Sequence, residues 1–155
     1  MKLLFEALDS ALVQGWRKWS PDAYGAEPER VVAEGAGNPC RHCLDFVPEG
    51  AGMLILAHRP FSAPQPYAET GPIFVCADDC ARGGGGALPP ILRTSPDYIL
   101  RGYGADERIV YGTGRVVRRE EVETYARDLL KRSTIAFVDV RSARNNCFQL
   151  RIRRV

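Results

Sequence analysis

The chain has 155 residues, 45% of them hydrophobic and 26% charged, which is the composition of an ordinary globular protein. This length suffices for one hydrophobic core, and we expect a single α+β domain over residues 1–155. The formal net charge of +2 is far below that of a typical nucleic-acid-binding domain, so nucleic acid is disfavoured as a partner. No apolar run approaches the roughly 20 residues that cross a bilayer, and we expect no membrane association.

The start of the chain does not resemble a secretory signal. Residues 1–6, Met-Lys-Leu-Leu-Phe-Glu, are too short an apolar stretch and reach an acidic residue too soon. The chain has five cysteines, an odd number, whereas a secreted disulfide framework normally pairs them all. We therefore expect a cytoplasmic protein, in a compartment that keeps thiols reduced.

The N-terminal half predicts short strands separated by irregular segments. Residues 2–7 favour a strand, and Asp9-Ser10 supplies an N-cap for a short helix that reaches Trp16. The segment at about 20–39 is rich in Pro, Gly, Asp and Glu, and we expect it to be irregular. Two apolar runs of strand length follow, at residues 52–57 and 73–75. The four glycines that come next, residues 83–86, predict a flexible surface loop.

The C-terminal half has a clearer pattern. Residues 98–103 and 108–111 predict a β-hairpin, which residues 115–117 extend. Residues 120–132 predict a helix, because apolar residues recur at helical spacing between an acidic start and a basic end. Two more strands, residues 135–140 and 147–153, flank a turn. The fold class is therefore α+β, with a mostly antiparallel sheet and one well-defined covering helix.

Four of the five cysteines form two closely spaced pairs, Cys40-x2-Cys43 and Cys76-x3-Cys80. This is close to the two-hook spacing that holds a tetrahedral zinc ion, and we expect one structural zinc bound by these four thiolates. Either of the chain's two histidines, at positions 42 and 58, could replace one thiolate. The alternative is a set of free thiols, because cysteine also packs as a small hydrophobe.

Redox chemistry of the thioredoxin type is a second interpretation of Cys40 and Cys43. It needs a helix that starts at the motif, because the helix N-terminus lowers the pKa of the first thiol. A proline and a glycine soon after the pair oppose such a helix.

Cys147 is the candidate nucleophile. It follows a turn that contains Arg144 and comes soon after Arg141, and positive neighbours lower the pKa of a thiol. A general base would have to be one of the two histidines. The alternative is an ordinary, half-buried strand cysteine.

A polar loop at residues 67–72 presents a phenol, a carboxylate and a hydroxyl. Basic and amide side chains elsewhere could face it and form a pocket for a small anion or amide ligand. The candidate ligand-binding residues are Arg41, Tyr67, Glu69, Arg144 and Asn145. The alternative is a structural loop whose polar groups bond to the backbone.

Four motifs occur in a characteristic order: Pro39-Cys40-Arg41, Gly71-Pro72-Ile73-Phe74-Val75, Leu100-Arg101-Gly102-Tyr103, and residues 140–148 with the sequence VRSARNNCF. Together they resemble the bacterial family known as domain of unknown function 1203, from about residue 38 onward. The resemblance implies a compact protein with no assigned activity, so it transfers no functional residue. The family pattern often has serine at the position of Cys43, which suits a metal site particular to this branch.

These observations predict a binding or accessory module with one structural zinc ion. A small thiol-dependent enzyme that uses Cys147 is the alternative, and the sequence leaves open whether the protein is an enzyme. We expect the partner to be a small polar or anionic ligand, or another protein.

Overall fold

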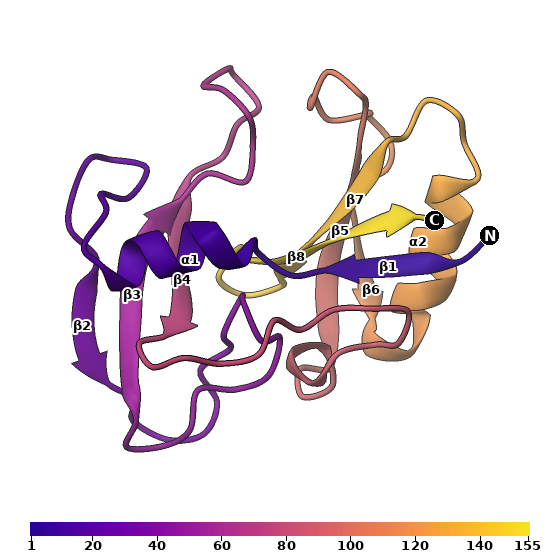
Figure 1. The fold of residues 1–155 in the computed structure, drawn as a ribbon. Coiled ribbons are helices and arrows are strands. Elements are labelled where there is room, and N and C mark those ends of the chain that lie inside the picture. Colours follow the sequence, from indigo (N-terminus) through magenta and orange to yellow (C-terminus); the bar gives the residue numbers. More distant parts are fainter.

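The computed structural model describes all 155 residues and contains two antiparallel sheets that lie side by side (Figure 1). The larger sheet has the order β1-β8-β7-β5-β6, and the smaller has the order β2-β3-β4. The strands of the larger sheet are β1 (Leu3–Glu6), β5 (Asp97–Tyr103), β6 (Arg115–Arg118), β7 (Phe137–Ser142) and β8 (Phe148–Arg154). Those of the smaller sheet are β2 (Glu29–Val32), β3 (Gly52–His58) and β4 (Gly71–Cys76).

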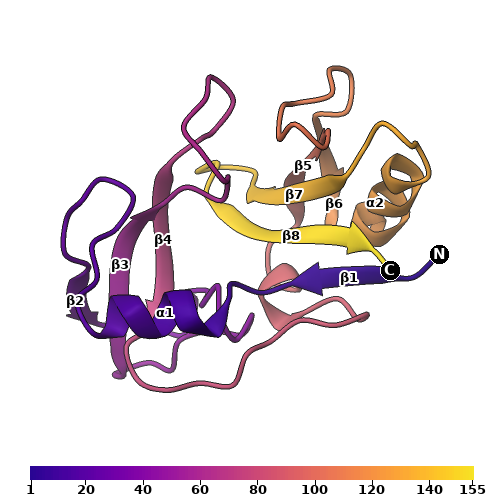
Figure 2. The same cartoon turned by 45° about the horizontal axis from the view of Figure 1, so that its top comes forward.

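One helix covers each sheet (Figure 2). Helix α2 (Val122–Leu130) follows a 3-10 turn at Arg119–Glu121 and buries one apolar face against the larger sheet. Helix α1 (Ser10–Arg17) buries Val13 and Trp16 in the core of the smaller sheet. The predicted α+β class and the predicted helix at residues 120–132 are confirmed. No helix is both long enough and apolar enough to span a membrane.

The hydrophobic core is divided between the two sheets. The core beneath α2 contains 18 buried residues, and the core beneath α1 contains 13. Strand β8 contributes to both, because Phe148 lies in the smaller core while Leu150 and Ile152 lie in the larger one. The start of β8 is therefore where the two sheets are joined.

The hairpin predicted for residues 98–103 and 108–111 is wrong in its second strand. Ile109 makes only an isolated bridge to Tyr103, and the regular partner of β5 is β6. The Thr113 side chain explains the change, because its hydroxyl accepts from the Gly102 N–H at 2.9 Å and donates to the Val110 carbonyl at 2.6 Å. The Thr113 side chain therefore bonds to the Gly102 N–H, which a second regular strand would otherwise pair.

Two segments are more ordered than their composition predicts. The segment at about 20–39 contains β2, an exposed edge strand that pairs with β3 and lacks the alternation that would have revealed it. The glycine tract is not a free loop, because Gly85 exchanges two backbone hydrogen bonds with Phe5 of β1, at 2.8 and 3.1 Å. Residues 83–86 thus form a surface loop as predicted, and these two hydrogen bonds tether it to β1.

A buried ion pair joins β7 to β8. Asp139 is fully buried, and Arg151 lies opposite it in the sheet register. Arg151 donates from Nε to Oδ1 at 2.7 Å and from Nη2 to Oδ2 at 2.9 Å. Its Nη2 also reaches the Pro60 carbonyl at 2.7 Å, and its guanidinium lies over the Phe137 ring. The pair therefore also anchors the chain that leaves β3.

Replacing Asp139 with alanine leaves the Arg151 charge buried without its partner, and we expect the free energy of unfolding to fall by about 3–5 kcal/mol. Urea denaturation measures this change. The control is Asp128→Ala, because Asp128 is exposed and pairs with Lys131 on the surface, where such pairs contribute less than about 1 kcal/mol. Equal, small losses in the two variants would contradict a structural role for the buried pair.

Candidate functional site

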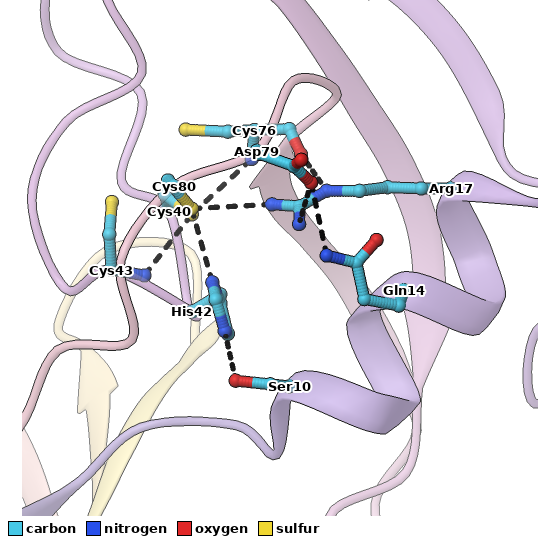
Figure 3. A network of polar contacts seen from close by, with 9 residues as sticks. All are labelled: Ser10, Gln14, Arg17, Cys40, His42, Cys43, Cys76, Asp79 and Cys80. Atoms are coloured by element: carbon cyan, nitrogen blue, oxygen red, sulfur yellow. Dashed lines mark hydrogen bonds and ion pairs between the residues drawn. The ribbon is translucent and has the colours of Figure 1, made fainter.

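The side chains of Cys40, Cys43, Cys76 and Cys80 converge on one point, with all four sulfur atoms within 4.8 Å of one another (Figure 3). The Sγ atoms of Cys40 and Cys80 are 4.0 Å apart, and all the cysteines are free thiols. A tetrahedral zinc ion with Zn–S bonds of about 2.3 Å separates its sulfur ligands by about 3.8 Å. The four thiols thus lie close enough together to form a possible tetrathiolate metal site.

The first cysteine pair lies on a tight turn. Pro39 bridges to Phe46, the Cys40 N–H donates to the Asp45 carbonyl at 2.9 Å, and the Leu44 N–H donates to the Cys40 carbonyl at 3.0 Å. Inside this turn the Cys43 N–H points to the Cys40 sulfur at 3.5 Å. The turn therefore presents both thiols on one side and gives the Cys40 sulfur a backbone donor.

The second pair is positioned by the β3–β4 hairpin. Strand β4 ends at Cys76, and the chain then turns so that Cys80 returns to the same point. Cys40 lies beside Phe74 in a parallel bridge, so the first turn runs alongside the end of β4. The Cys76 N–H donates to the Cys40 sulfur at 3.3 Å. The long separation between the two pairs is therefore the length of a hairpin that brings them together.

Helix α1 supplies polar partners to the cluster (Figure 3). Arg17 donates from Nη2 to the Cys80 sulfur at 3.2 Å and from Nε to the Cys76 carbonyl at 3.0 Å. His42 places Nδ1 3.1 Å from the Cys80 sulfur, and its Nε2 lies 2.8 Å from the Ser10 hydroxyl. His42 thus contacts a candidate ligand and is not itself part of the four-residue cluster, and partners of this kind orient metal ligands.

The four thiols change one another's pKa values. The neighbouring thiols of Cys43 and Cys76, with the backbone N–H groups, hold the pKa of Cys40 well below its usual range. The neighbouring Cys40 sulfur raises the pKa of Cys43 to about 12 and also raises the pKa of Cys76, and burial raises the pKa of Cys80. Four thiolates at this spacing, two of them buried, would repel one another, so all four can be ionised together only if a cation neutralises them.

The first turn also packs against the glycine tract. The Gly83 N–H donates to the His42 carbonyl at 2.8 Å. A Cβ atom at Gly83 would lie 2.1 Å from the Cys43 carbonyl oxygen, which is far inside contact distance. Only glycine allows this approach, so the predicted loop also supports the cysteine turn.

A polar cavity of about 340 Å³ lies where the two sheets meet, apart from the cysteine cluster. Its walls come from the end of β3, the start of β4 with the residues before it, and the β7–β8 turn. The lining includes His58, Glu69, Thr70, Arg141, Asn145 and Cys147. The structure thus brings Glu69 and Asn145, two of the predicted ligand residues, to one cavity.

The other three predicted ligand residues lie elsewhere. Arg41 is buried and donates to the carbonyls of Phe148 and Pro39, each at 2.7 Å, so it fastens the first cysteine turn to β8. The Tyr67 hydroxyl bonds to the Tyr111 hydroxyl at 2.7 Å, on the loop between β5 and β6. Arg144 is exposed and pairs with Asp97. None of the three lines the cavity.

Arg141 is the cavity residue that sequence reasoning did not select as a ligand-binding group. Its side chain is only 6% exposed, and Nη1 lies 3.0 Å from a Glu69 carboxylate oxygen. Arg101 pairs with the same carboxylate. The signal in the sequence is a second charged residue, two positions after Asp139, in a strand that begins with apolar residues.

Cys147 and His58 line the same cavity, but no hydrogen bond joins them. The Cys147 thiol points to the Asn145 carbonyl at 3.7 Å. Burial, together with the positive charge of Arg151, lowers the pKa of His58 to about 4, so its ring is neutral at pH 7. The ring packs edge-on to Trp16 and to Phe148.

Residues 37–154 match the model of a family described as Protein of unknown function (DUF1203). The chain belongs to this family. The match covers most of the chain and begins after α1 and β2, so Arg17, which contacts Cys80, and Ser10, which contacts His42, precede the matched region. Neither the curated proteins nor the solved structures gave a match.

Replacing Gly83 with alanine should force the Cys43 turn away from its position, and we expect an unfolding free energy lower by about 1–3 kcal/mol. If the four thiols bind metal, loss of the ion to a chelator should also be at least several-fold faster. Gly37→Ala is the matched control, because nothing lies within 4 Å of a Cβ there. A Gly83→Ala protein that is as stable as the control would show that the close approach is not required.

Proposed function

We propose that this protein is a small binding module whose smaller sheet is held together by one structural zinc ion on Cys40, Cys43, Cys76 and Cys80. The observation that carries the proposal is the convergence of four sulfur atoms within 4.8 Å of one another. Four thiolates complete a tetrahedral zinc shell and leave no position for a substrate, which is the pattern of a structural site.

The surroundings of the cluster support a structural role. Cys40 and Cys76 belong to the smaller core, which has 13 buried residues to hold three strands and a helix. An ion at this point would tie the first cysteine turn to the end of β4, while Arg41 ties the same turn to β8. Metal binding energy adds directly to folding free energy where the ligands come together only in the folded chain.

The odd number of cysteines is unlike a secreted disulfide framework, and we propose that the protein works in the cytoplasm. The polar cavity between the sheets is the place where we propose that a small ligand binds. Its volume of about 340 Å³ lies near the lower end of the range for ligand sites, roughly 300–1,000 Å³.

Replacing Cys76 with serine removes one of the four thiolates, and we expect the protein to lose its zinc and at least about 3 kcal/mol of unfolding free energy. Elemental analysis of protein purified without a metal-binding tag, together with denaturation curves, measures both quantities. Cys147→Ser is the control and should keep about one zinc per chain. Equal stability of the two variants would count against a structural metal.

A thiol-dependent enzyme is the second candidate function, because Cys147 and the neutral His58 line one cavity. The two functions differ in the reactivity of Cys147. Because no base contacts this thiol, we expect iodoacetamide to alkylate it no faster than a free cysteine in a peptide at pH 7. Mass spectrometry of the modified peptide gives the rate, and a rate tenfold or more above the peptide would favour the enzyme.

A further inference from the structure

Strand β2 leaves one edge of the smaller sheet open. It pairs with β3 on one side only, and no other segment lies beyond it (Figure 1 and Figure 2). The opposite edge of this sheet is covered, because Cys40 bridges to Phe74 of β4. Strand β2 contains no proline, no lysine and no bulge, which are features that keep edge strands from pairing with another chain. A further strand can therefore add to this edge.

The outward backbone groups of β2 have no partner. Just after β2, the Ala33 N–H donates to the Ala51 carbonyl at 2.8 Å, and the register of β2 on β3 continues this pairing. Backbone groups alternate in direction along an antiparallel pair, so Arg30 and Val32 direct theirs away from β3. No hydrogen bond joins the Arg30 or Val32 backbone to a segment outside this sheet. These groups form a template on which another strand can pair.

The charges along β2 and the two residues that follow it are self-complementary. Residues 30–34 have the sequence RVVAE, with a cation at one end and an anion at the other. An antiparallel second copy centred on Val32 would place Arg30 of each chain opposite Glu34 of the other. The two Val32 residues would then exchange both of their backbone hydrogen bonds, since these groups point outward. Opposite charges directly across a strand pair stabilise it, so this register is favoured.

Both charges are available for such a contact. Arg30 and Glu34 are exposed, and neither forms an ion pair within the chain. The Arg30 guanidinium lies over the Trp19 ring, 5.0 Å from its centroid, which leaves the N–H groups at its rim free for a carboxylate. The Glu34 carbonyl accepts from the Asn38 side chain at 3.0 Å, but the Glu34 carboxylate has no hydrogen-bond partner.

Charge disfavours the same contact at β6, the open edge of the larger sheet. This strand has the sequence Arg-Val-Val-Arg. If its residues paired antiparallel with those of a second copy, each terminal arginine would lie opposite another arginine, and like charges across a strand pair destabilise it. The two open edges share a pair of valines but differ in charge, and only β2 is complementary to itself.

We propose that β2 pairs with β2 of a second copy of this chain, antiparallel and centred on Val32, so that two smaller sheets join into one continuous sheet. The Val32 side chain is 65% exposed in the single chain, and its counterpart would cover it. This inference goes beyond the binding role proposed above and uses neither the cavity nor the metal. The contact spans only about five residues a side, so we expect a weak dimer with a Kd on the order of 100 µM.

Sedimentation equilibrium of the full-length protein, from about 10 µM to about 1 mM, measures this association. We expect the average mass to rise from that of one chain toward that of two. Two-dimensional ¹⁵N–¹H spectra over the same concentrations locate the contact. The amide signals of Arg30 and Val32 should shift with concentration, while those of α2 stay unchanged.

Charge exchange tests the register. Glu34→Arg opposes like charges at both ends of the contact, and we expect the Kd to rise at least about tenfold, as for Arg30→Glu. The double variant Arg30→Glu/Glu34→Arg restores opposite charges in reversed order and should return the Kd to within about threefold of the original. Glu123→Arg is the matched control, because Glu123 is an exposed residue of α2 and the change of charge is the same. This control should dimerise as the unmodified protein does.

A protein that stays monomeric at about 1 mM would overturn the proposal. A dimer that Glu34→Arg weakens no more than the control does, or that the double variant fails to restore, would place the contact elsewhere and overturn it too. Thermal melting checks that each variant folds. If a variant does not fold, the spectra of the unmodified protein decide, because concentration-dependent shifts at β6 or α2 in place of β2 would contradict the pairing.

Discussion

The smaller half of the structure depends on the meeting of two turns at one point. The first turn carries Cys40 and Cys43, the second carries Cys76 and Cys80, and the bridge between Cys40 and Phe74 holds them together. Four sulfur atoms within 4.8 Å cannot all carry a charge in a buried place unless a cation neutralises them. A metal ion bound at this point, as proposed above, would couple its own binding to the folding of the smaller sheet.

The same arrangement positions the cavity. The turn that carries Cys40 is fastened to Phe148 by Arg41, and Phe148 is also the first residue of β8 and part of the cavity wall. The opposite wall is the start of β4, whose other end supplies Cys76. The cysteine cluster and the cavity thus lie at two ends of one hairpin, so the proposed ion would stabilise the scaffold on which the cavity residues are placed.

Motifs and secondary structure that depend on nearby residues could be predicted from the sequence. Contacts between residues far apart in the chain could not. The Cys-x2-Cys and Cys-x3-Cys pairs, the helix at residues 120–132 and most strands follow from spacing within a few residues. The contact of Arg17 with Cys80, the close approach of Gly83 to Cys43 and the pairing of Arg141 with Glu69 join segments that are tens of residues apart. Edge strand β2 could not be predicted, because all four of its residues are exposed and the sequence therefore shows no alternation of apolar and polar residues.

The most direct test of the central claim is X-ray absorption spectroscopy at the zinc edge, on protein purified without a metal-binding tag. We expect about one zinc per chain with four sulfur neighbours at about 2.3 Å and no nitrogen neighbour, because His42 contacts Cys80 and is not one of the four converging residues. A chain without metal, or a shell in which imidazole nitrogen replaces sulfur, would contradict it.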